Sequence, residues 1–265
     1  MKYLIKSILV LFTLLVVQSC NLFSAAGLSS QGQPTKEVQG ELMAVDPSEV
    51  IVDHSVWDGL LKKHVDNFGR VDYKGFQKDK AQLTEYLTML SKQQPKERWS
   101  VQELLAYYIN TYNAYTVNLI LENYPVKSIK DINGPWTKGI VPIGDTDLSL
   151  GGIENGILRK MNEPRIHFAI NCASYSCPKL LNEAFVPSKI DRQLERVTKE
   201  FINSDKNDIR SQNPKLSSIF DWYRKDFIVN GKVDVIAYIN RYSDTKITLE
   251  TSIEYKNYDW NLNEQ

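Results

Sequence analysis

The sequence predicts an α+β fold, a mainly helical domain packed on a small antiparallel sheet. Several segments repeat apolar residues every three or four positions, as helices with one buried face do. A polar turn at residues 144–147 separates two short extended runs within residues 140–150, which predicts a hairpin. Residues 165–171 alternate apolar and polar side chains, the pattern of a strand with one buried face.

The helix expected over residues 101–123 has the clearest boundaries. Ser100 and Glu103 stand at the spacing of a capping box, which marks the start of a helix. Its apolar residues spread around much of its surface, so this helix should lie at the centre of the domain. Asn110 and Asn113 are three residues apart and therefore share one of its faces.

Other elements are expected on both sides of this helix. Before it in the chain, helices are expected over residues 54–68 and 77–91. After it and the hairpin, the pattern predicts a short helix over 151–161, then the strand, and then a helix that starts after Pro187-Ser188. Two further helices, over 217–228 and 233–241, and an extended tail over about 246–260 complete the chain. No internal repeat or second linker divides them, so residues 46–265 are expected to form one domain.

Residues 1–19 have the composition of a signal peptide. Lys2 and Lys6 give a positively charged start, and the apolar run 7–17 is too short to span the ~30 Å hydrocarbon core of a bilayer. The segment ends at Cys20 in a sequence that resembles the lipobox of bacterial lipoproteins, whose cysteine is lipidated. The protein is therefore expected to be exported and held to a membrane by lipid on Cys20.

Residues 20–45 are expected to form a flexible tether between the lipid and the domain. They are rich in Ser, Gly, Gln and Ala and show no sustained hydrophobic period. Asn21 follows the cysteine at a position where Asp commonly signals retention in the inner membrane. The outer membrane is therefore favoured over the inner one.

Composition excludes some classes of function. Lys+Arg and Asp+Glu both total 32 and no basic stripe stands out, so nucleic acid is not an expected partner. Three cysteines in 265 residues exclude a disulfide-built mini-protein. The 14 Tyr and 5 Trp suit a cleft that holds peptides or glycans as well as a core. No cofactor is expected.

The segment best suited to chemistry joins the expected strand to the loop after it. His167 lies on the polar side of that strand, and Cys172 and Cys177 follow in the loop. A thiol becomes a strong nucleophile as a thiolate, and a nearby imidazole can remove its proton. The pattern predicts a Cys–His site in which either thiol attacks an acyl carbon and His167 acts as the base. Glu154 or Asp226 would orient the imidazole.

Polar side chains around this segment are candidate binding groups. Asn171 and the loop N–H groups are candidates to polarise a carbonyl, and Arg165 shares the polar side of the strand. Asn110 and Asn113 are further candidates, although buried amides more often brace a loop than bind a ligand. Asp226 is also a candidate, with capping or salt bridging as the alternative role.

Two other interpretations of the thiols stay open. His167, Cys172 and Cys177 supply three zinc ligands, but a tight C-x2-C pair and a fourth ligand are missing, so no metal is assigned. Alternatively, His167 is a structural residue with a hydrogen-bonded ring. The two cysteines would then be buried or joined in a disulfide, which an oxidising compartment favours.

Several short blocks carry a resemblance to a known family. They are Tyr-Ile-Asn110-Thr-Tyr-Asn113-Ala, Leu148-Ser-Leu with Ile153-Glu154 and Ile157-Leu-Arg159, Arg165-Ile-His167-Phe-Ala with Asn171-Cys172 and Ser-Cys177-Pro178, Trp222-Tyr with Asp226-Phe227, and Tyr258-Asp259-Trp260-Asn-Leu-Asn263. In this order they resemble the domain of unknown function 547 over about residues 54–263. That family occurs in exported bacterial proteins and in plant proteins, and its activity is not settled.

The resemblance implies a fold distantly similar to papain-like and transglutaminase-like enzymes, which pack a central helix against a small sheet that carries a His. In those enzymes the nucleophilic Cys opens the central helix, whereas here both thiols follow His167. The family commonly has a His directly after the Glu of the Ile-Glu pair, and this chain has Asn155 there. If that His takes part in chemistry in relatives, this protein is altered or inactive.

Together these features predict a lipid-anchored protein of the cell envelope with a hydrolase-like cleft. A cysteine in the cleft would carry out acyl transfer or amide hydrolysis. The alternative is a non-catalytic binding lipoprotein that uses the same aromatic-rich cleft. The expected partners are the membrane, through the N-terminal lipid, and a peptide or glycan in the cleft.

Overall fold

The structure is a computed structural model that describes residues 20–43 and 50–265. The signal peptide expected over residues 1–19 therefore lies outside the described residues. Within the described parts of the chain, no helix is both long enough and apolar enough to cross a membrane.

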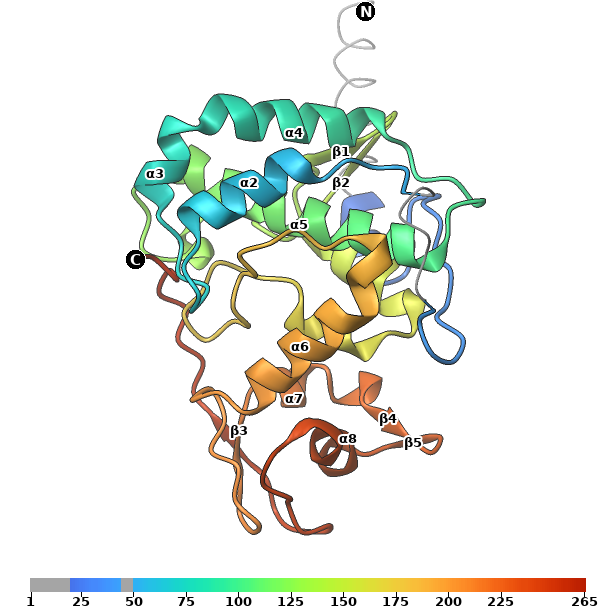
Figure 1. Cartoon of the computed structure of the whole chain (residues 1–265), viewed down its shortest axis with the longest axis vertical. Helices are drawn as coiled ribbons and strands as arrows, with labels where there is room; N and C mark the ends of the chain where they lie inside the picture. Colours follow the sequence, from blue (N-terminus) through green and yellow to red (C-terminus); the bar gives the residue numbers. More distant parts are fainter. Residues whose placement is uncertain (1–19, 44–49) are drawn as a thin grey trace, which may run out of the picture.

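Helix α5 (Val101–Asn123) runs through the middle of the fold, with other elements on both sides (Figure 1). Its first turn is capped by Ser100, whose side chain accepts a hydrogen bond from the backbone N–H of Glu103. Almost every residue between positions 102 and 121 is buried. The prediction of a central helix with these boundaries is therefore confirmed.

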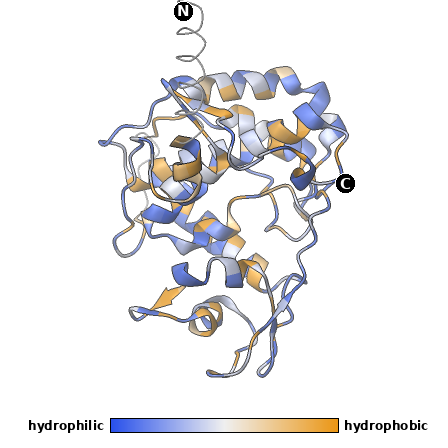
Figure 2. Ribbon diagram, turned by 180° about the vertical axis from the view of Figure 1, so that it is seen from behind, coloured by the Kyte–Doolittle hydropathy of each residue, from blue (hydrophilic) through white to orange (hydrophobic). Residues whose placement is uncertain are grey.

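One side of α5 is covered by three helices and a hairpin. They are α2 (Ser55–His64), α3 (Tyr73–Lys78), α4 (Lys80–Lys92), and the hairpin of β1 (Val141–Ile143) and β2 (Thr146–Leu148). The outermost helix, α4, carries both hydrophilic and hydrophobic residues along its length (Figure 2) and buries its leucines toward the core. The predicted hairpin is confirmed.

Two of the expected helices differ from the prediction. The helix expected over residues 54–68 ends at His64, because Val65 already adopts an extended backbone. The helix expected over residues 77–91 is divided at Asp79 into α3 and α4. The carboxylate of Asp79 accepts a hydrogen bond from the ring of His64, so the break also ties these helices to α2.

The other side of α5 carries the C-terminal part of the chain. Its elements are α6 (Ile190–Ile202), β3 (Lys215–Ser217), α7 (Ile219–Trp222), β4 (Ile228–Val229), β5 (Lys232–Val233), α8 (Val235–Tyr242) and β6 (Glu254–Lys256). Helices α6 and α8 agree with the prediction. The helix expected over residues 217–228 is wrong, since that segment holds the short α7, one turn of 3₁₀-helix and β4.

The α+β class is confirmed, but the sheet is not the single antiparallel one expected. The described residues form three two-stranded sheets, of which β1–β2 and β4–β5 are antiparallel and β3–β6 is parallel. None of them carries His167, which lies in a 3₁₀-helix. The expected likeness to papain-like and transglutaminase-like enzymes, which place a His on a sheet, therefore has no support.

The strand expected over residues 165–171 is wrong. Residues Pro164–Phe168 form a 3₁₀-helix, in which Pro164 takes the first turn and the Glu163 side chain accepts a hydrogen bond from the N–H of Arg165. Proline suits the start of a helix because its missing N–H would have no partner there. Of the residues expected on the polar face, His167, Ala169 and Asn171 are buried and Arg165 is half-buried, so the alternation did not mark a side that faces solvent.

The flexible tether expected over residues 20–45 is also wrong for its described part, residues 20–43. The N–H of Val38 donates to the carbonyl of Met161 at 2.8 Å, and the side chains of Val38 and Leu42 are buried. Apolar residues spaced along this segment gain by covering the domain, so the chain lies against it instead of hanging free.

Candidate active site

The loop that carries the two thiols is held by amide side chains. From α5, Asn113 donates Nδ2–H to the carbonyl of Ala169 at 3.0 Å and accepts the N–H of Asn171 at 2.8 Å. Asn171 in turn donates to the carbonyl of Pro178 at 2.7 Å and accepts the N–H of Ala173 at 2.8 Å. These buried hydrogen bonds fix the loop at both ends.

Four of the expected binding groups are therefore structural. The amides of Asn113 and Asn171 are hydrogen-bonded to the backbone of the loop. Asn110 donates to the carbonyl of Phe185 at 2.7 Å and accepts its N–H at 3.0 Å. Arg165 binds Glu163 and does not line the thiol pocket described below. Asn171 also lines a second pocket, and a ligand-binding role for these four side chains stays a prediction.

Asn113→Ala is expected to lower the free energy of unfolding by about 3 kcal/mol, because the carbonyl of Ala169 and the N–H of Asn171 lose their buried partner. Urea unfolding followed by circular dichroism measures the loss. Asn118→Ala is the matched control, since Asn118 lies on the same helix and bonds only the side chain of Glu122 near solvent. It should cost less than about 0.5 kcal/mol. Equal losses would contradict the bracing role.

Cys172 is the thiol with the most hydrogen-bond partners. Its Sγ lies 2.9 Å from Sγ of Cys177, 3.0 Å from Oγ of Ser174 and 3.3 Å from the hydroxyl of Tyr258. The N–H of Cys172 also donates to Sγ of Cys177 at 2.9 Å. Ala173 makes this turn possible with a φ of 58°, a left-handed conformation that costs a non-glycine residue about 1 kcal/mol. Such strain is often found at functional sites.

These contacts give the two thiols different pKa values. Hydrogen bonds to the sulfur, first from Cys177 and then from Ser174 and Tyr258, lower the pKa of Cys172 to about 7 against the opposing effect of burial. Burial raises the pKa of Cys177 well above its usual value. Burial also raises the pKa of Tyr258, so its hydroxyl keeps its proton and can donate to the sulfur. Of the two sulfurs, Cys172 is therefore the one that ionises near neutral pH, whereas Cys177 keeps its proton.

His167 is oriented by Asp226. Its Nε2 lies 2.8 Å from Oδ2 of Asp226, and its ring stacks on that of Tyr223 with the centroids 4.0 Å apart. Nδ1 is buried without a hydrogen-bond partner among the described residues. Arg159 donates to both oxygens of Asp226 at 2.6 and 2.8 Å. Although burial opposes the change, His167 and Arg159 hold the pKa of Asp226 well below its usual range.

Glu154 does not orient His167. Its carboxylate accepts hydrogen bonds from the hydroxyls of Tyr112, at 3.2 Å, and Tyr223. It lies in a turn of π-helix, Gly152–Ile157, within the segment where a short helix was expected. Of the two acids considered for His167, Asp226 therefore takes that role and the expectation for Glu154 is wrong.

Asn155, the residue that departs from the family pattern, is structural in this chain. Its Oδ1 accepts from Arg159 at 2.9 Å, and its Nδ2 donates to the carbonyl of Ala25 at 2.9 Å. This amide therefore supports the arginine that binds Asp226. It also holds the N-terminal segment against the domain.

The thiols, His167 and Glu154 line one pocket of about 320 Å³, which we call the aromatic pocket. Trp222, Tyr258 and Trp260 form a cluster at its wall, with ring centroids 4.6 to 5.8 Å apart. In the described chain, neither ring nitrogen of His167 is hydrogen-bonded to a thiol. The four residues predicted as catalytic thus line one pocket, but the direct Cys–His hydrogen bond is not formed.

The zinc interpretation has no geometric support in residues 20–43 and 50–265. No group of three or more His, Cys, Asp or Glu side chains there is arranged to hold a metal ion. The disulfide interpretation does not describe this structure either, because Cys172 and Cys177 are free thiols.

Several residues of the pocket were not identified as site residues from the sequence. They are Tyr112, Trp136, Trp222, Tyr223, Tyr258 and Trp260. Some of them lie in the blocks that resemble the family. Those blocks, and not the hydrophobic pattern, could have identified them as site residues. Tyr258 is the most informative omission because it contacts the sulfur of Cys172.

Comparison with known families gives one match. Residues 96–202 match the model of the family described as Protein of unknown function, DUF547. The matched part holds α5, Glu154, His167 and both thiols, whereas Asp226 and Tyr258 lie beyond it. No curated protein and no solved structure matches this chain. The match supports the expected family resemblance and assigns no activity.

Proposed function

We propose that this protein uses Cys172 as the nucleophile of an acyl transfer or amide hydrolysis in the aromatic pocket. The observation that carries the proposal is a thiol with its pKa lowered to about 7, contacted by two hydroxyls and a second thiol at a pocket wall. About half of such a thiol is thiolate at neutral pH, so it needs no base to become reactive.

The reaction would run in two steps. The thiolate of Cys172 attacks the carbonyl carbon, and the electron pair of the C=O bond moves to oxygen. The hydroxyls of Ser174 and Tyr258, which lie 3.0 and 3.3 Å from the attacking sulfur, would donate to that oxygen. When the oxyanion collapses, the bond to the leaving amine or alcohol breaks and a thioester remains on Cys172. Water or an acceptor amine then releases the acyl group and restores the thiolate.

The pair of His167 and Asp226 supports the proton transfers of this scheme. Nε2 is occupied by Asp226, so Nδ1 is the nitrogen that would give a proton to the leaving group and take one from water. Its missing hydrogen bond is one that a bound substrate would supply. Asp226 stabilises the cationic ring before the first of these transfers and after the second.

We further propose that the protein is exported and anchored by lipid on Cys20 to the cell envelope, on the outer membrane in preference to the inner one. The proposal rests on the leader-like composition of residues 1–19. It is consistent with the position of Cys20, which is exposed on the protein surface.

A second candidate is a binding protein for a peptide or glycan, and the aromatic cluster favours it. Trp222 is 48% exposed although it packs against Tyr258 and Trp260. Exposed, pre-packed aromatic rings are characteristic of surfaces that bind sugar rings or apolar side chains. This function needs the pocket but no reactive thiol, so thiol chemistry separates the two candidates.

The rate of alkylation of Cys172 by iodoacetamide is expected to rise with pH to half its maximum near pH 7. In Cys177→Ala the midpoint should move to higher pH, because the largest of the contacts that stabilise the thiolate is lost. Mass spectrometry of peptides reads each cysteine separately and also shows whether Cys20 carries lipid. A midpoint near that of a free cysteine, unchanged in the variant, would refute a nucleophilic Cys172.

A further inference from the structure

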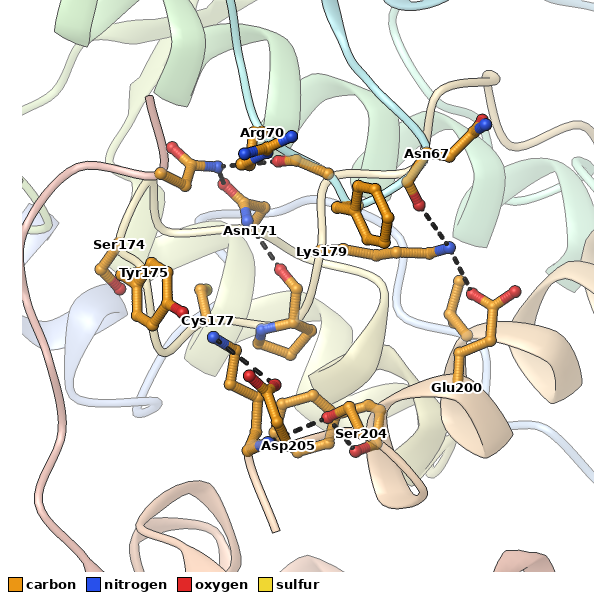
Figure 3. A pocket seen from close by; sticks show the side chains of 17 residues that line it. Asn67, Arg70, Asn171, Ser174, Tyr175, Cys177, Lys179, Glu200, Ser204 and Asp205 are labelled. Atoms are coloured by element: carbon orange, nitrogen blue, oxygen red, sulfur yellow. Dashed lines mark hydrogen bonds and ion pairs between the residues drawn. The ribbon is translucent and has the colours of Figure 1, made fainter. Parts of the chain in front are cut away.

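Cys177 separates two pockets of the molecule. One is the aromatic pocket, which both thiols line. The other, which we call the outer pocket, has a volume of about 490 Å³ and is lined by Cys177 but not by Cys172 (Figure 3). A reagent in the aromatic pocket can therefore reach both thiols, whereas a reagent in the outer pocket can reach only Cys177.

The two sulfurs are also neighbours. Their Sγ atoms lie 2.9 Å apart, and the backbone N–H of Cys172 points at Sγ of Cys177. The hydrogen bonds of Asn113 and Asn171 hold the loop that carries the two cysteines in this conformation. A pair of thiols brought into contact by a braced loop can close a disulfide without rearranging the domain.

We propose a second activity, thiol–disulfide exchange, in which Cys172 attacks a disulfide in the aromatic pocket, Cys177 closes the internal disulfide, and an external thiol reopens it through the outer pocket. The proposal uses the same sulfur as the acyl transfer, but it does not depend on that reaction. It accounts for Cys177, which the acyl transfer uses only as a hydrogen-bond donor.

The forward reaction is balanced between the protein and its substrate. The Cys172 thiolate attacks one sulfur of a substrate disulfide RSSR′, forms a mixed disulfide with RS and expels R′S⁻. The Cys177 thiol gives its proton to R′S⁻, and the resulting thiolate attacks Sγ of Cys172 and expels RS⁻, which takes a proton from water. The substrate gains two electrons and the two cysteines lose them.

The return reaction has a preferred direction of attack. Thiol exchange is faster when the leaving thiolate is the more stable one. An external thiolate should therefore attack Sγ of Cys177 and expel the Cys172 thiolate, whose pKa is the lower of the two. A second external thiolate then attacks the mixed disulfide, which oxidises the two external thiols to a disulfide and restores Cys177. The outer pocket is lined by Cys177 and not by Cys172, so a thiol there meets the sulfur that this attack needs.

The charges of the outer pocket favour an anionic thiol. Lys179 is already paired with Glu200 at 2.7 Å, as Figure 3 shows. Lys206 is less engaged, because its Nζ lies 3.9 Å from a carboxylate oxygen of Asp205 and 3.6 Å from the ring centroid of Tyr175. It is therefore the cation best placed to attract a carboxylate-bearing thiol such as glutathione.

The first test uses the full chain in oxidised glutathione, with the cysteines identified by peptide mass spectrometry. The wild type should lose both free thiols together and hold a Cys172–Cys177 disulfide. Cys177→Ser should accumulate glutathione on Cys172 at least about 10-fold faster than Cys172→Ser accumulates it on Cys177. Circular dichroism checks that both variants fold. The proposal is overturned if the folded wild type keeps both thiols free, or if the two variants react equally.

The second test addresses the outer pocket. Lys206→Glu should slow reduction of the internal disulfide by reduced glutathione at least about 3-fold, while leaving reduction by uncharged 2-mercaptoethanol unchanged. Lys232→Glu is the matched control, because Lys232 is exposed on β5 and lines neither pocket. Equal effects of the two substitutions would remove the outer pocket from the proposal. None of these measurements requires acyl transfer, so either activity can fail while the other stands.

Discussion

Cys172→Ser is expected to lower acyl transfer from a simple ester such as p-nitrophenyl acetate by at least about 100-fold. The reason is that a serine hydroxyl in the same place keeps its proton at neutral pH. The cysteine, by contrast, is held near its midpoint of ionisation by Cys177, Ser174 and Tyr258. Release of p-nitrophenol gives the rate, and the mass of the Cys172 peptide shows the bound acetyl group.

Two controls make this result specific. In protein produced without the lipid, Cys20→Ser removes an exposed thiol outside the pocket and should leave the rate unchanged. Tyr258→Phe keeps the ring in the aromatic cluster but removes the hydroxyl 3.3 Å from the sulfur, and should slow the reaction by a smaller factor of about 10. Acetyl found on Cys20, or an undiminished rate in Cys172→Ser, would show that the chemistry lies elsewhere.

The parts of the fold that the sequence predicted well are set by local contacts. Helix α5 begins where Ser100 caps the N–H of Glu103, three residues along the chain. The hairpin of β1 and β2 depends on a turn of a few residues. Interactions of this range leave a signature in the sequence, because the residues concerned are neighbours.

The parts that it did not predict depend on distant residues. Asp226 is 59 positions from His167, and Tyr258 is 86 positions from Cys172. The sequence alone could not decide whether Glu154 or Asp226 orients His167, because neither acid has a neighbour in the sequence that fixes its role. In the structure, Arg159 binds Asp226 beside His167, whereas Tyr112 and Tyr223 bind Glu154.

The wrong predictions for residues 165–171 and 20–43 have the same cause. Residues 165–171 alternate over too few positions to distinguish a strand from a buried 3₁₀ turn. Pro164, at the start of the segment, favours the turn. Residues 20–43 looked like a linker by composition, yet Val38 and Leu42 find an apolar surface on the folded domain. Composition describes what a segment is made of, whereas its position depends on the surface that the rest of the chain offers.

Asp226→Asn is expected to lower the free energy of unfolding at pH 7 by about 2 kcal/mol. The substitution removes the charge that Arg159 binds with two hydrogen bonds and that His167 also binds. The side chain of Asp226 is 21% exposed, so water replaces part of the loss and the cost stays below that of a fully buried pair. The same variant should slow acyl transfer, because the ring of His167 loses its anionic partner.

The pH dependence of this loss has a defined sign. The pKa of Asp226 in the folded protein lies below its usual value of 3.8, so its carboxylate stabilises the fold above that pH. The stabilisation is lost as the pH falls through the folded pKa. Urea unfolding should therefore show the full difference between wild type and Asp226→Asn at pH 7 and a smaller one at pH 3. Asp221→Asn, which neutralises an exposed carboxylate on the neighbouring α7, is the control and should change stability by less than about 0.5 kcal/mol at either pH. A difference for Asp226→Asn that grows toward acid would mean that Asp226 is not held ionised by Arg159 and His167.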